Sequence, residues 1–232
     1  MIDTICLDAG GTLVWPNWVR VADALAAEGI AVDVALLAAA DPRVRRSLDE
    51  RHLIAASTDQ SRGWSFFDDV LTMAGVELTP GAHRALSSIE EYQRKSNIWE
   101  HVPEFVVPTL TKLRRDGYKL VVVSNANGTV QRAFRRVGLL DLVDFIVDSA
   151  DVGFEKPDRR LFDEALRLAG TDHSCALHAG DMYHIDVAGA RAAGLTPVLV
   201  DEANLYLEAD CHRIRSIAEL PELLSAITFD TR

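Results

Sequence analysis

Residues 2–13 read IDTICLDAGGTL, a short apolar run that ends in Asp8 and a Gly-Gly-Thr turn. Apolar and β-branched side chains predict a buried strand over residues 2–7, with the Asp8 carboxylate at its carboxyl end. Similar short apolar runs follow at residues 120–123, 145–147, 176–178 and 197–200. Short apolar strands separated by helical segments are typical of a parallel sheet with crossover helices, so we expect an α/β fold.

Helical segments alternate with these runs. Residues 104–116, 158–168 and 187–193 each place apolar side chains along one face, and a glycine follows each of them. Glycine is favoured where a helix ends, so three helices are predicted here. A last helix is expected at residues 214–227, with an interruption near Pro221 because proline lacks a backbone N–H.

The long stretch between the first and second strands contains no clear strand, and its periodicity is helical. Helices are predicted at residues 19–27, 34–53, 64–73 and 82–99. We therefore predict a three-layer Rossmann-like core with a parallel sheet and an inserted all-helical cap domain. The core is expected to comprise residues 1–14 and 100–232, and the cap residues 15–99.

Composition and charge limit the classes of partner. The chain has 232 residues, 48% of them hydrophobic, which is sufficient for a packed core. A formal net charge of −11 argues against nucleic acid or an anionic membrane as the main partner. Three cysteines without metal-ligand spacing suit a reducing compartment, and no secretory signal or membrane span is visible. We expect a cytoplasmic monomer or homodimer.

Polar clusters lie at or just after four of the predicted strand ends. In chain order they are Asp8 to Leu13, Ser124-Asn125, Lys156-Pro157, and Gly180-Asp181 followed by Asp186. Each cluster alone is ordinary in a turn, but the four occur in order along the chain. The carboxyl edge of a parallel sheet is where ligands bind, so the sequence predicts one site built from all four.

In order and spacing, these clusters resemble the four motifs of the haloacid dehalogenase superfamily, which is dominated by phosphatases, and the resemblance covers the whole chain. It implies that Asp8 is the nucleophile and that Ser124 and Lys156 bind and stabilise the phosphoryl group. It also implies a Mg²⁺ site formed by Asp8, the backbone carbonyl of Gly10, Asp181 and, more weakly, Asp186. Thr12 and Asn125 are expected among the substrate-binding residues.

Gly10 departs from the family pattern. The family's phosphatases carry a second aspartate here, which protonates the leaving group and then activates water. General acid–base catalysis of this kind contributes roughly 10²–10⁴-fold to the rate. We therefore expect a weak or specialised magnesium-dependent phosphatase for a small phosphorylated molecule, fastest with acidic leaving groups. Whether another acid replaces the aspartate is left open, with His184, Tyr183, His52, Asp59 and Asp68 as candidates.

Other chemistries remain alternatives. Relatives resembling phosphonoacetaldehyde hydrolase carry a small residue at this position and a cap lysine, but the predicted cap has only Lys95, near its far end. Relatives resembling 2-haloacid dehalogenase carry a bulky aromatic residue there and need no metal. A third alternative is a non-catalytic protein that binds phosphate and metal or has a regulatory role.

The predicted cap also contains candidate substrate contacts. Residues 61–64 read SRGW and are expected to form a glycine-containing break between two helices. Such a break is able to face the site, where Arg62 would meet an anionic group and Trp64 an apolar one. Ordinary packing between helices is the alternative explanation for Trp64.

Overall fold

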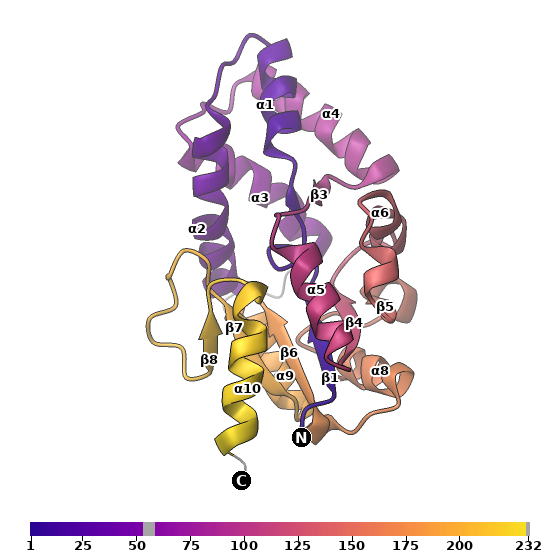
Figure 1. Ribbon diagram of the computed structural model, residues 1–232. Helices are drawn as coiled ribbons and strands as arrows, with labels where there is room; N and C mark the ends of the chain where they lie inside the picture. Colours follow the sequence, from indigo (N-terminus) through magenta and orange to yellow (C-terminus); the bar gives the residue numbers. More distant parts are fainter. Residues whose placement is uncertain (53–58, 231–232) are drawn as a thin grey trace. The chain divides into compact units, whose positions relative to one another are not determined.

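The computed structural model describes residues 1–52 and 59–230; the side chains of residues 51–52, 59–64 and 228–230 are not described. The chain divides into two compact units (Figure 1). The larger unit consists of Met1–Trp15 and Val102–Arg232, and the smaller unit of Pro16–His101.

A six-stranded parallel sheet forms the centre of the larger unit. Its strands are β1 (Thr4–Leu7), β4 (Lys119–Ser124), β5 (Phe145–Asp148), β6 (Ala176–Gly180), β7 (Thr196–Val200) and β8 (His212–Ile214). They lie side by side in the order β5-β4-β1-β6-β7-β8. The chain builds outward from β1 on one side and then crosses to the other, which opens a crevice at the carboxyl end of β1. The predicted α/β class is confirmed, and β8 was not predicted.

Helices cover the sheet. In the larger unit they are α5 (Val106–Arg115), α6 (Val130–Arg136), α7 (Ser149–Val152), α8 (Arg159–Ala169), α9 (Ala188–Ala193) and α10 (Leu220–Asp230). Buried side chains of α8 and α9 form one apolar cluster with Cys6 of β1, Val121 and Val123 of β4, and Val147 of β5. Among the described residues, no helix is both long and apolar enough to cross a bilayer.

Helix α8 is the element that carries the chain away from Lys156. Its first turn is capped by Asp158, whose side chain accepts a hydrogen bond from the backbone N–H of Arg160. Apolar side chains at positions such as Leu161 and Phe162 are fully buried against the sheet. The helix ends at Gly170 with a φ of 61°, as the sequence predicts. Packing of α8 therefore fixes the position of the loop just before it.

The smaller unit is mainly helical. It contains α1 (Trp18–Ala27), α2 (Val34–His52), α3 (Asp59–Met73) and α4 (Pro80–Ser96). Short strands β2 (Trp15–Pro16) and β3 (Trp99–His101), which were not predicted, pair with each other. An aromatic cluster of Trp18, Phe66, Phe67 and Trp99 holds the helices together, with ring centroids about 5–6 Å apart.

Two local predictions were wrong. The expected break at residues 61–64 is absent, because α3 begins at Asp59 and continues through Gly63. A glycine inside a helix costs only about 1 kcal/mol relative to alanine, and burial of the Phe66 and Phe67 side chains offsets this cost. The last helix, expected from residue 214, begins only at Leu220. Pro221 therefore lies in the first turn of α10, where its missing N–H is tolerated, and does not interrupt the helix.

The apolar contact between α8 and the sheet is open to a stability test. Leu161→Ala should lower the free energy of unfolding by about 2–5 kcal/mol, because a fully buried leucine leaves a cavity when truncated. Urea denaturation followed by circular dichroism measures this change. The matched control is Leu207→Ala, since Leu207 is 70% exposed and its truncation should change stability by less than about 0.5 kcal/mol. Equal effects would contradict the assigned core.

Candidate active site

Asp8 lies directly after β1, at the crevice of the sheet. Its backbone N–H donates to the carbonyl of Ala179, 2.9 Å away, and the residue is buried. The chain then turns tightly, because the N–H of Gly11 reaches the carbonyl of Val14 at 2.8 Å. Gly11 has a φ of 74°, in the left-handed region that favours glycine. Within this turn Gly10 forms a bridge with Val14, so Asp8 stands at the base of a short closed loop.

Lys156 brings a buried ammonium group to the Asp8 carboxylate. Its Nζ lies 2.5 Å from Asp8 Oδ1 and 2.8 Å from Asp186 Oδ1. The Lys156 side chain is only 2% exposed. Asn125, just after β4, holds the backbone of Lys156: its Oδ1 accepts from the Lys156 N–H at 2.6 Å and its Nδ2 donates to the carbonyl at 3.0 Å. Asn125 therefore positions Lys156.

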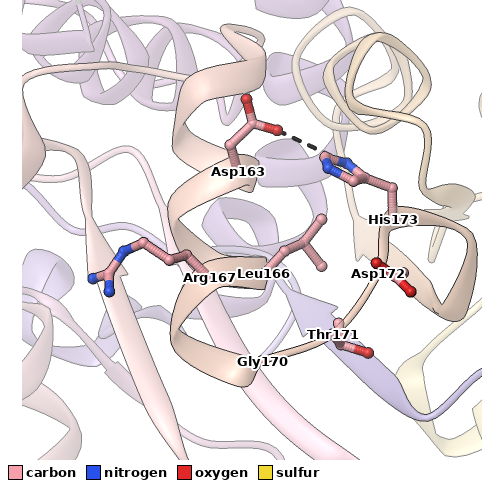
Figure 2. Close-up of a pocket in the computed structure, with 7 residues that line it drawn as sticks. All are labelled: Asp163, Leu166, Arg167, Gly170, Thr171, Asp172 and His173. Atoms are coloured by element: carbon pink, nitrogen blue, oxygen red, sulfur yellow. Dashed lines mark ion pairs between the residues drawn. The ribbon is translucent and has the colours of Figure 1, made fainter.

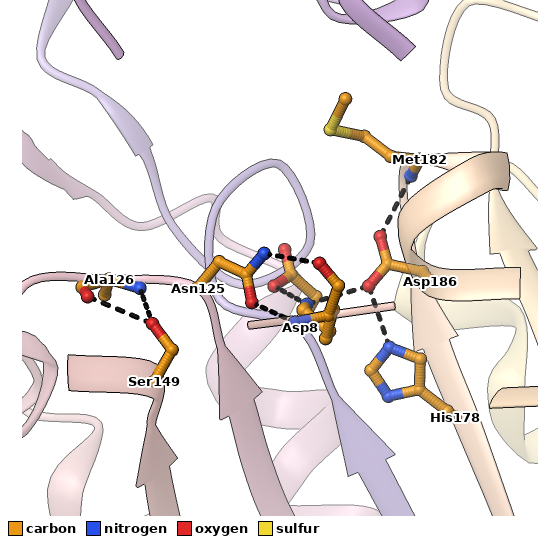
Figure 3. Close-up of polar contacts among 8 residues, drawn as sticks. Asp8, Asn125, Ala126, Ser149, His178, Met182 and Asp186 are labelled. Carbon is orange, nitrogen blue, oxygen red and sulfur yellow. Dashed lines mark hydrogen bonds and ion pairs between the residues drawn. The ribbon is translucent and has the colours of Figure 1, made fainter. Parts of the chain in front are cut away.

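Asp186 accepts three hydrogen bonds within the site. Its Oδ1 accepts from Lys156 and from His178 Nε2, which lies 2.9 Å away, and its Oδ2 accepts from the N–H of Met182 at 3.0 Å (Figure 3). The carboxylate lies against Gly180, where an added Cβ would be 2.2 Å from Asp186 Cγ. Glycine at position 180 is therefore what allows Asp186 to reach inward.

The carboxylates fit a hard divalent cation. Asp8, Asp181 and Asp186 each offer an oxygen, and these oxygens lie within 4.8 Å of one another. Oxygens on opposite sides of Mg²⁺ lie about 4.2 Å apart, since each Mg–O distance is about 2.1 Å. Asp186 already accepts three hydrogen bonds, which occupy much of its capacity to bind a cation.

Burial and charge perturb the acid–base behaviour of these groups. Burial raises the pKa of Asp8 to about 6; the Asp186 charge adds to this rise and Lys156 opposes it. Burial alone would lower the pKa of Lys156, but the Asp186 and Asp8 carboxylates hold that pKa above its ordinary value. Burial would raise the pKa of Asp186, yet Lys156 and His178 keep that pKa below its usual range. Lys156 is therefore charged across the physiological range.

The structure locates most of the other predicted site residues. Ser124 is buried at the end of β4, and Thr12 is fully buried in the turn after Asp8. The side chains of Arg62 and Trp64 lie outside the described residues. Tyr183, a candidate replacement acid, uses its hydroxyl to donate to Asp210 at 2.5 Å and to accept from Arg191 at 2.9 Å.

The sequence analysis missed one residue of the site, His178, and did not predict the role of another, Gly180. His178 contacts Asp186 from the middle of β6, and Gly180 provides the space for the Asp186 carboxylate. A polar signal was present, because a histidine interrupts the otherwise apolar sequence of β6, ALHAG.

A cavity of about 390 Å³ lies elsewhere in the larger unit (Figure 2). Its lining comes from the end of α8 and the residues after it: Asp163, Leu166, Arg167, Gly170, Thr171, Asp172 and His173. These last residues lead into the amino end of β6, whereas Asp8 follows the carboxyl end of β1. In a parallel sheet these are opposite edges, so this cavity is separate from the site.

The sequence matches the family model of the haloacid dehalogenase-like hydrolases over residues 2–194. This match spans most of the chain. The chain belongs to the haloacid dehalogenase-like hydrolase family.

Two curated relatives match part of the chain, and only one of them is named for a specific activity. The chain is 41% identical over 102 residues to haloacid dehalogenase-like hydrolase domain-containing protein 3 of Bos taurus, covering 44% of this chain and 40% of that protein. It is 37% identical over 103 residues to the glyceraldehyde 3-phosphate phosphatase of Methanothermobacter thermautotrophicus, covering 44% of this chain and 46% of that protein. The chain thus spans less than half the length of these curated relatives.

A solved structure matches over nearly the full length. The 2-haloacid dehalogenase from Pseudomonas syringae pv. Tomato DC3000 is 28% identical, with a TM-score of 0.61. The match covers 97% of this chain and 99% of that one. The two proteins therefore share the arrangement of the sheet and its helices.

The close approach of Gly180 and Asp186 predicts a local effect of substitution. Gly180→Ala should lower the free energy of unfolding by about 1–3 kcal/mol, because the new methyl group displaces a carboxylate held by three hydrogen bonds. Chemical denaturation measures this loss. Gly81→Ala is the control, since its Cβ would meet nothing nearer than 3.5 Å and should change stability by at most about 1 kcal/mol, upward. A neutral Gly180→Ala would contradict the packing of Asp186.

Proposed function

We propose that the protein is a magnesium-dependent phosphatase that acts slowly on small phosphorylated molecules through an aspartyl-phosphate at Asp8. One observation carries the proposal: Lys156 Nζ is buried 2.5 Å from Asp8 Oδ1, beside a cluster of three carboxylates. A buried carboxylate next to a fixed ammonium group suits attack on an anionic phosphoryl group, because the cation offsets the repulsion between the two anions.

The residues divide the reaction between them. The Asp8 carboxylate attacks phosphorus, so a bond from phosphorus to Asp8 forms as the bond to the leaving oxygen breaks. Lys156 and the Ser124 hydroxyl donate hydrogen bonds to the phosphoryl oxygens and stabilise the charge of the transition state. Water then attacks the aspartyl-phosphate, which releases inorganic phosphate and restores the Asp8 carboxylate.

A bound Mg²⁺ supplies positive charge that reduces repulsion between Asp8 and the phosphoryl oxygens. Asp8, Asp181 and the Gly10 carbonyl would hold it, with Asp186 as a weaker partner. Three carboxylates with one ammonium group leave a net negative site when all are ionised. A divalent cation would bring this site close to neutrality before an anionic substrate enters.

Gly10 sets the expected speed. Glycine offers no acid for the departing oxygen and no base for the attacking water, so we assign both proton transfers to solvent in this proposal. The loss corresponds to roughly 10²–10⁴-fold in rate. Substrates with acidic leaving groups need the least help, so aryl phosphates should be turned over faster than alkyl phosphates.

A dehalogenase is the second candidate. The full-length similarity to a 2-haloacid dehalogenase at 28% identity supports it, and the partial similarity to glyceraldehyde 3-phosphate phosphatase supports the first proposal. The charge of the site favours the phosphatase, because a metal-free reaction would leave three buried carboxylates opposed by one lysine. A non-catalytic protein that binds phosphate and metal is the remaining alternative.

The first test uses p-nitrophenyl phosphate at high protein concentration, with and without Mg²⁺. Slow, magnesium-dependent release of nitrophenol is expected, and Asp8→Asn should reduce it to background because an amide cannot form the acyl phosphate. A matched control is Asp163→Asn, which changes a partly exposed carboxylate that lines the separate cavity and should retain activity. Chloride release from 2-chloropropionate without metal would instead support the dehalogenase. If neither substrate is turned over, the interpretation that remains is a non-catalytic protein that binds phosphate and metal.

Restoring a carboxylate at position 10 tests the cause of slow turnover. Gly10→Asp should raise magnesium-dependent hydrolysis by roughly 10²–10⁴-fold, with a larger gain for alkyl than for aryl phosphates. The ratio of kcat values for the two substrate types measures this difference. Gly10→Asn adds similar volume without an ionisable group and should give no such gain. Equal rates for Gly10→Asp and Gly10→Asn would contradict the proposed role of this position.

A further inference from the structure

His178 is a buried polar residue that the proposed chemistry does not use. It is the middle residue of β6 and is 1% exposed. Its register partner on β1 is Cys6, and its ring packs edge-on against Phe162 of α8, with centroids 4.9 Å apart. An imidazole buried in an apolar layer destabilises the fold unless it is hydrogen-bonded, so its polar partner indicates its role.

That partner is Asp186. His178 Nε2 lies 2.9 Å from Asp186 Oδ1, and an ionised carboxylate only accepts hydrogen bonds. The proton of the ring must therefore sit on Nε2. Burial lowers the pKa of His178, which favours the neutral ring, and the contact geometry directs the Nε2 N–H at Asp186.

The sheet geometry explains why this contact is fixed. Side chains two residues apart on a strand point to the same face, so His178 and Gly180 lie on one face of β6. The Asp186 carboxylate fills the space above Gly180 and lies over the His178 ring (Figure 3). The carboxylate is thus held by the strand beneath it, by the Met182 N–H and by Lys156.

A chain of buried contacts runs from His178 to the nucleophile. His178 bonds Asp186 at 2.9 Å, Asp186 bonds Lys156 at 2.8 Å, and Lys156 bonds Asp8 at 2.5 Å. Asp186 Oδ1 is shared by the His178 and Lys156 donors. Without the His178 N–H, that oxygen keeps only Lys156, and the carboxylate is held less firmly, by the Met182 N–H on its other oxygen. It can then turn about this contact and draw the ammonium group away from Asp8.

We propose that His178 is a positioning residue that fixes Asp186, and through it Lys156, in the geometry for phosphoryl transfer. The proposal rests on the function proposed above but concerns a residue outside the reacting groups. It differs from a structural role in one measurable way: removing the N–H should impair the chemical step more than it impairs folding.

The kinetic test compares two substitutions of His178. His178→Leu retains apolar volume without a donor, and kcat for p-nitrophenyl phosphate should fall about 10- to 100-fold with little change in KM. His178→Gln places an amide N–H near the position of Nε2 and should recover most of this loss. Equal kcat values for native protein and His178→Leu would overturn the proposal, as would equal losses in the leucine and glutamine variants.

The Phe162→Leu variant separates the effect of lost packing from the effect of the lost hydrogen bond. This change alters the apolar contact with the His178 ring but leaves the hydrogen bond to Asp186 in place. It should lower the thermal midpoint as much as His178→Leu without a tenfold loss of kcat. A similar kcat loss in Phe162→Leu would assign the effect to packing and overturn the proposal.

A second readout does not depend on turnover. In lysine-labelled protein, the buried Lys156 ammonium group should give a slowly exchanging NMR signal that shifts or broadens in His178→Leu and returns in His178→Gln. An unchanged signal in His178→Leu overturns the positioning role even if the protein is an active phosphatase. Conversely, a protein without turnover but with this pattern retains the positioning role while the proposed function fails.

Discussion

The burial of the Lys156 ammonium group between Asp8 and Asp186 is the interaction on which the rest of the site depends. An unpaired ammonium group in this position would cost several kcal/mol, so both carboxylates must stay within hydrogen-bonding distance. Asn125 holds the backbone of Lys156, and α8 begins three residues later. The packing of α8 on the sheet and the placement of the Lys156 ammonium group therefore depend on each other.

Much of this arrangement was predictable from the sequence, because strands that are buried on both faces have continuous apolar sequences. The ends of those runs located Asp8, Ser124 and Asp181 on one edge of the sheet before any contact was known. Strand β8 escaped prediction for the same physical reason. It is an edge strand with the sequence His-Arg-Ile and only one buried residue, Ile214, so it carries no apolar run.

The contacts that hold the site could not be predicted from the pattern. Gly180 belonged to a Gly-Asp pair, and nothing in the sequence showed that its missing side chain makes room for the carboxylate of Asp186. Asn125 was expected beside the substrate, whereas its amide is bonded to the backbone of Lys156. Such roles depend on the three-dimensional approach of a strand and two loops, which hydrophobic periodicity does not encode.

Gly10 raises the question of whether the site still binds charged ligands, and the buried charges of the site help to answer it. Replacing buried ion pairs with apolar residues is often neutral or stabilising, so this network is not explained by stability alone. Burial also raises the pKa of Asp8 to about 6, which shows that its charged form is disfavoured before any cation or substrate is present. Under the proposed function, a bound cation and an anionic substrate would stabilise this network. Glycine at position 10 has no side chain to transfer protons, whereas the charged side chains of the site are present, so on that proposal the glycine affects turnover far more than binding.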